Sequence, residues 1–118
     1  MKKLTTLLSI AAVGLMFALP ARAADDDTKT IKGEVLDMAC YLDHGASGEN
    51  HAACAQKCIS SGLPVGIKDA DGKVYLIIGA HKPLNDELAP LAAKQVSIKG
   101  KVVSRDGINM IENAEIVK

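Results

Sequence analysis

Hydrophobic and polar positions alternate in several short runs of this 118-residue chain, and such alternation is typical of β-strands. Residues 31–38, IKGEVLDM, alternate imperfectly and predict a first strand. Two further runs surround Asp71-Gly72 in residues 63–79, and two more surround Asp106-Gly107 in residues 95–118. Because Asp-Gly pairs favour the tight turns of hairpins, these segments predict two β-hairpins.

Helical patterns interrupt the strands in two places. Residues 48–61 predict a helix inserted after the first strand, and Gly62 marks its end. Residues 85–94 also begin as a helix, with acidic residues in the first turn. Pro90 prevents a regular continuation there, so we expect one or two short turns.

The order of these elements predicts a mainly-β fold, a five-stranded OB-like barrel. A Cys/His-bearing helix follows strand 1, and a short helix lies between strands 3 and 4. Gly33 and Gly100 fall within strands, where glycine is typical of the bends or bulges that let long strands curl. An open five-stranded meander would give the same order of elements, but the barrel is the favoured interpretation. We expect one such domain over residues 31–118.

The N-terminal residues have the organisation of a secretory signal peptide, which we assign to residues 1–23. Two lysines precede an apolar run over 7–19, and Ala-Arg-Ala at 21–23 is a small-residue cleavage site. That run is too short to span a membrane comfortably, and no later segment approaches the necessary length. We therefore expect a periplasmic protein that begins near Ala24, with a flexible leader over 24–30 and no membrane span after cleavage.

The composition and the missing motifs exclude several classes of protein. Aromatic residues make up only 3% of the chain, so the core must be aliphatic, and a disulfide or a metal would help to stabilise so small a domain. The chain has 14 basic and 14 acidic residues, and removal of the signal peptide takes away three of the basic ones. No basic stripe of a nucleic-acid-binding protein is present. Phosphate loops, nucleophile elbows and HExxH motifs are also missing, so nothing in the sequence indicates an enzyme.

Residues with metal-binding side chains gather in one short segment. In a helix, His51, Cys54 and Cys58 would share one stripe because they are three and four residues apart. This stripe could simply be the buried face of an amphipathic helix, in which small cysteines pack well. The spacings Cys40-x3-His44 and Cys54-x3-Cys58 also let two ligands reach one ion, and thiolates suit copper or zinc. The predicted metal ligands are Cys40, His51, Cys54 and Cys58, with His44, Met38 and Met110 as weaker candidates.

A disulfide is the alternative, because cysteines of exported proteins usually pair. Cys54 and Cys58 would be helical neighbours, too far apart for an unstrained bridge, so Cys40 would pair with one or the other. Such a bridge is worth roughly 3 kcal/mol in the chain-entropy model but leaves one thiol over. Thiol–disulfide exchange is a third interpretation, although the C-x-x-C spacing of redox proteins is absent.

Three other polar residues carry weaker signals. Asp37 and Asp43 flank Cys40 and could orient a histidine, as carboxylates behind metal ligands do, although such residues are more often turn acids. His81 lies in a probable loop after a strand, and we expect it to be solvated.

Three segments, GEVLDMACYLDHG, HAACAQKCISSGLPVG and DGKVYLIIG, resemble a group of small exported bacterial proteins. These proteins carry the pattern G-x-V-x-D-x-x-C…H-x-x-C-A-x-x-C-x-x-x-G-x-P. The resemblance implies an OB-like β domain and no settled activity. His44 and the methionines lie outside the pattern. The polar positions that it implies are shared are Cys40, His51, Cys54 and Cys58.

We therefore expect a small periplasmic binding protein that holds copper or zinc at the Cys/His cluster. The alternative is a disulfide-stapled OB-like module without a metal, which would bind a periplasmic protein partner.

Overall fold

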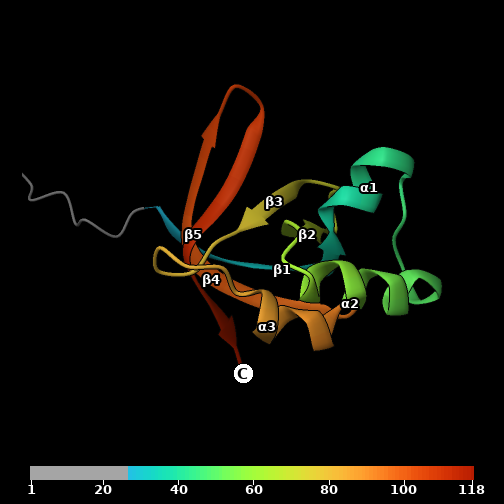
Figure 1. The fold of residues 1–118 in the computed structure, drawn as a ribbon. Coiled ribbons are helices and arrows are strands. Elements are labelled where there is room, and N and C mark those ends of the chain that lie inside the picture. The colour runs from blue at the N-terminus through green and yellow to red at the C-terminus, as the bar shows by residue number, and fades with distance from the viewer. Residues whose placement is uncertain (1–26) are drawn as a thin grey trace, which may run out of the picture.

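The structure, a computed structural model, describes residues 27–118, so the predicted signal peptide lies outside the described residues. Its five strands form a closed barrel in the order β1-β2-β3-β5-β4 (Figure 1), which confirms the OB-like barrel and not the open meander. The elements are β1 (Thr28–Asp37), α1 (Met38–His44), a 3-10 turn (Glu49–His51), α2 (Ala52–Ser60), β2 (Val65–Asp69), β3 (Val74–Ile77), α3 (Asn85–Leu88), a second 3-10 turn (Ala89–Leu91), β4 (Gln95–Arg105) and β5 (Ile108–Val117).

Strand β1 belongs to both halves of the barrel, because it pairs antiparallel with β2 and with β4. Gly33 lies where the two pairings overlap, opposite Asp69 and Val96, and a side chain there would collide with the backbone of Lys68. Gly100 occupies the register shift between β4 and β5. Gly100 therefore lies at an irregularity of the kind predicted for it, whereas Gly33 allows two strands to approach closely.

The two hairpins form as predicted, with β2 pairing β3 and β4 pairing β5. Asp106 and Gly107 both have positive φ, as a type I′ turn requires. A short parallel contact between β3 and β5, at Ile77 and Ile111, then closes the barrel. Strand β1 begins at Thr28, so residues 28–30 pair with β4, whereas we expected them in the leader.

The segment after β1 holds two helices where one was predicted. Asp37 caps α1, since its Oδ1 accepts a hydrogen bond from the backbone N–H of Ala39 at 3.0 Å. Gly45, with φ of 73°, ends this helix. The strand predicted over 31–38 therefore stops one residue early, and Met38 is helical instead. The helix predicted over 48–61 is present as a 3-10 turn followed by α2.

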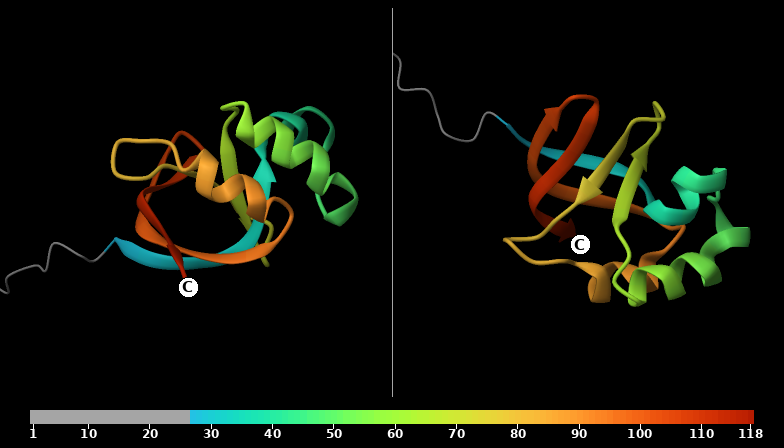
Figure 2. Two further views of the ribbon diagram at one scale, coloured as in Figure 1. Left: turned by 60° about the horizontal axis from the view of Figure 1, so that its bottom comes forward. Right: turned by 45° about the horizontal axis from the view of Figure 1, so that its top comes forward.

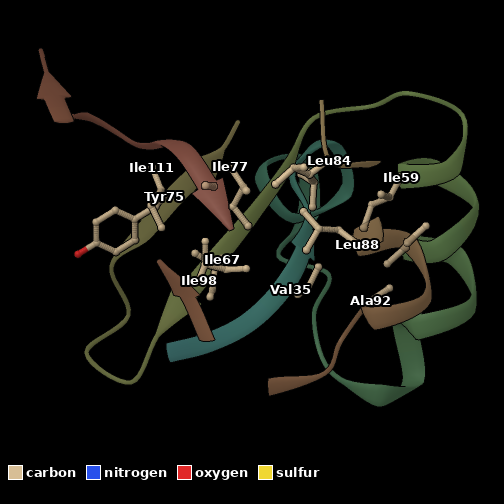
Figure 3. Packing of buried hydrophobic residues seen from close by; sticks show 14 residues of the cluster. Val35, Ile59, Ile67, Tyr75, Ile77, Leu84, Leu88, Ala92, Ile98 and Ile111 are labelled. Atoms are coloured by element: carbon tan, nitrogen blue, oxygen red, sulfur yellow. The ribbon is translucent and has the colours of Figure 1, made fainter. Parts of the chain in front are cut away.

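Aliphatic side chains from the strands fill the barrel, and α2 and α3 close one end of it (Figure 2). Helix α3 stops at Leu88, and Pro90 lies in the 3-10 turn that follows, as predicted. Within residues 27–118, no helix is long and apolar enough to cross a membrane. The buried cluster is shown in Figure 3 and includes Val35, Ile59, Ile67, Ile77, Leu84, Leu88, Ile98 and Ile111.

Candidate metal centre

Helices α1 and α2, which both lie beyond the end of β1 that Asp37 forms (Figure 1), carry matching series of polar side chains. Within each series the residues are three and then four positions apart, so each series occupies one helical face. The series that α1 and its cap supply is Asp37, Cys40 and His44, and the series from α2 and the turn before it is His51, Cys54 and Cys58.

The two faces meet and form two groups of ligand atoms. Atoms of Cys40, His51 and Cys54 all lie within 4.8 Å of one another, and so do atoms of Asp37, Cys40 and Cys58. Ligands of one tetrahedral zinc ion are separated by about 3.3–3.8 Å, so small side-chain movements would complete either group. A Cys/His cluster at metal-binding distance is therefore present, but Cys58 lies with Asp37 and not in the group of His51 and Cys54.

The cluster lies at the edge of the domain rather than in its core. Cys54 is exposed, whereas Cys40, His51 and Cys58 are half-buried. The face of α2 that packs on the core consists of Ala55 and Ile59, which are 2% and 0% exposed. The interpretation of the cysteine stripe as the buried face of a helix is thus wrong, because the stripe faces α1.

Asp37 is the one fully buried charged residue among residues 27–118. Its Oδ2 has no hydrogen-bond partner and lies 3.7 Å from Nε2 of His51, an atom that is also buried and unpartnered. Both residues line a narrow space that has no room for a water molecule. Buried polar atoms are normally satisfied, so two unpartnered ones facing each other point to a missing ligand or to a small rearrangement.

Asp37 also sets the protonation of the neighbouring thiols. Burial raises the pKa of Asp37, but the neighbouring Cys40 thiol, the Ala39 amide and the Cys58 thiol stabilise the carboxylate and outweigh this effect, so the pKa is lowered. In return, the adjacent Asp37 carboxylate and, to a smaller extent, desolvation raise the pKa of Cys40 to about 12. Desolvation and then Asp37 raise the pKa of Cys58. A metal ion would therefore have to displace protons from these thiols.

The weaker ligand candidates lie outside both groups. His44 is exposed, and its Nδ1 lies 3.0 Å from the Asp43 carboxylate. Its ring is perpendicular to that of His51, with centroids 6.4 Å apart. Met38 is 5% exposed and packs against Gly66, so it is a core residue.

Two further residues considered from the sequence belong to neither ligand group. Met110 lies on β5 beside Leu76 of β3, and neither of these strands carries a residue of the two groups. His81 is exposed in the loop between β3 and α3, as expected.

All three cysteines of the chain lie in the described residues, and all are free. The disulfide considered from the sequence, between Cys40 and either Cys54 or Cys58, is not formed in this structure. Each thiol therefore remains able to bind a metal.

Sequence reasoning underestimated Asp37 and overlooked α1. The signals were present, because an Asp N-cap followed eight residues later by Gly45 is a typical start and stop for a short helix. With α1 recognised, the spacing of Asp37, Cys40 and His44 would have placed Asp37 on the same face as Cys40.

Comparison with protein-family models, with curated proteins and with solved structures gives no match to this chain, so its own geometry is the basis for a functional assignment.

Proposed function

We propose that this protein is a small periplasmic metal-binding protein that holds zinc or copper at the Cys/His cluster. One observation carries the proposal. The ligand atoms of Cys40, His51 and Cys54 come from two separate helices and converge within 4.8 Å of one another. This convergence is not the ordinary closeness of neighbouring residues on one helix, because Cys40 lies on α1 and Cys54 on α2.

The donor set supports a soft or borderline metal. Thiolates and imidazoles prefer zinc or copper, whereas magnesium and calcium prefer oxygen ligands. Three protein ligands leave the fourth position of a tetrahedral ion open, and the exposure of Cys54 places that position near solvent. We therefore infer a site that exchanges its ion with solvent or with a protein partner, rather than a closed structural site.

Metal titration of the reduced, chelator-treated protein tests the proposal. We expect at least one zinc or copper(I) ion per chain by native mass spectrometry. Binding to the folded state alone adds about 4 kcal/mol at a free ion concentration of 1,000 times Kd, so the melting temperature should rise by more than about 10 °C. Cys54→Ser should greatly reduce that rise, whereas His81→Ala, which changes an exposed histidine outside both ligand groups, should not.

Competition between zinc and copper(I), each buffered by a chelator of known affinity, identifies the preferred ion. The proposal would be contradicted by a reduced protein that binds neither ion, together with an unreduced protein, as isolated, whose mass is lower by two hydrogen atoms and which has one free thiol. That result would favour the disulfide-stapled module.

The periplasmic location rests on the sequence of residues 1–23. Expression of the full chain in a Gram-negative host should yield a periplasmic product whose N-terminal residue is Ala24. A product that stays in the cytoplasm and retains residues 1–23 would contradict this location.

A further inference from the structure

We propose that the cluster holds two metal ions, which the thiolate of Cys40 bridges. The outer ion lies between Cys40, His51 and Cys54, and the inner ion lies between Cys40, Cys58 and Asp37. This inference rests on the proposed metal-binding function and adds to it a second site, a bridging ligand and a carboxylate ligand.

The ligand atoms of the cluster divide into two groups. One tetrahedral ion bound by the three cysteines and His51 would need all four ligand atoms within about 4 Å of one another. In the structure, Cys58 shares a group with Asp37 and Cys40 but not with His51 and Cys54. Cys54 and Cys58 are one helical turn apart on α2, and only Cys40 belongs to both groups. Two ions, at successive positions along α2 and both bound by Cys40, fit this arrangement better than a single ion.

The environment of Asp37 also favours an ion in the inner group. Its carboxylate is fully buried, and its Oδ2 has no hydrogen-bond partner. No lysine or arginine among the described residues forms an ion pair with it, and its nearest cationic candidate is His51 at 3.7 Å. A buried carboxylate without a cation is costly. A metal ion between Asp37, Cys40 and Cys58 would supply the missing positive charge beside this carboxylate.

The total charge of the ligands identifies the class of ion. With all three thiols deprotonated, the five ligands carry three thiolate charges and one carboxylate charge. Two divalent ions neutralise them, whereas two copper(I) ions, or one zinc ion, would leave two negative charges in a partly buried site. A carboxylate ligand also suits zinc better than copper(I). The bridged pair is therefore a pair of zinc-like divalent ions.

Zinc titration of the reduced protein, followed by native mass spectrometry and calorimetry, tests the second site. We expect two zinc ions per wild-type chain. Cys58→Ser and Asp37→Asn should each leave one ion, and so should Cys54→Ser, which removes a ligand of the outer ion only. Cys40→Ser should weaken both ions, because a bridging ligand serves both.

Asp37→Asn is a useful variant because asparagine caps helices as well as aspartate does, so α1 should remain intact. Circular dichroism of the metal-free variant checks this. Asp43→Asn is the matched control, since it removes an exposed carboxylate from the same helix and should still bind two ions. If Asp37→Asn fails to fold, Cys58→Ser alone still distinguishes one site from two.

Cadmium NMR tests the bridge directly. The cadmium-loaded protein should give two cadmium signals, and both should correlate with the β-protons of Cys40. One ion per wild-type chain, whether or not Cys58→Ser removes it, would overturn the second site and leave the proposed function standing. Two ions whose signals share no cysteine would overturn the bridge. Failure to bind any ion would overturn the proposed function as well.

Discussion

Nε2 of His51 and Oδ2 of Asp37 lie 3.7 Å apart, both buried and both without a hydrogen-bond partner. The distance is too long for a hydrogen bond, which requires about 2.7–3.2 Å. It arises because the other oxygen of Asp37 is fixed by its cap of α1, while His51 belongs to the turn that begins the second helical segment. Asp37 thereby connects the two ligand groups, facing His51 of one and Cys58 of the other.

The capping role of Asp37 can be separated from its charge. Asp37→Ala removes the hydrogen bond to the N–H of Ala39 and should lower the free energy of unfolding of the metal-free protein by about 1–2 kcal/mol. Asp37→Asn keeps the cap and should cost clearly less. Urea unfolding of the reduced, metal-free proteins measures both. Equal losses would show that the carboxylate charge, and not the cap, stabilises this region.

The raised pKa of Cys40 predicts a loss of stability at alkaline pH. Its pKa rises from 9.0 in the unfolded chain to about 12 in the folded protein, so the folded state holds the thiol proton more tightly. This contribution is fully present below about pH 9 and is lost as the pH rises toward 12. The unfolding midpoint of metal-free protein in urea should therefore fall over this range. Cys40→Ser should flatten that part of the profile, and an unchanged slope would contradict the assignment.

Gly33 should tolerate no side chain. A Cβ there would collide with the backbone carbonyl of Lys68 on the neighbouring strand, a contact that cannot be relieved by a side-chain rotation. Gly33→Ala should therefore cost about 1–3 kcal/mol or more, as overpacking does. The exposed neighbour Lys32 provides the control, since Lys32→Ala should change stability by less than about 0.5 kcal/mol. Equal stability of the two variants would mean that β1 can move away from β2 without cost.

Pro90 should be replaceable. It is exposed, and α3 has already ended at Leu88, so the proline interrupts no helical hydrogen bond. Pro90→Ala should stay within about 0.5 kcal/mol of the wild type in chemical unfolding. A larger loss would show that the proline fixes the turn that carries Ala89 and Ala92 into the core.

Much of the barrel was predictable because its signals are local. Alternation identifies a strand within a few residues, and the Asp-Gly pair at 106–107 supplies the positive φ angles that a tight hairpin needs. Helix α1 was missed because it is only seven residues long and follows directly from a strand whose alternating pattern runs into Met38. A short helix has too few residues for its period to outweigh such a pattern.

The candidate site also has a part that local sequence predicted and a part that depends on tertiary packing. Helical spacing alone placed His51, Cys54 and Cys58 on one stripe, because residues three and four apart share a face of any helix. The partner of that stripe depends on how α1 packs against α2, a contact between residues distant in the sequence. Only the tertiary structure therefore placed Cys40 in both ligand groups and buried Asp37 beside them, since burial and convergence depend on packing that no local pattern encodes.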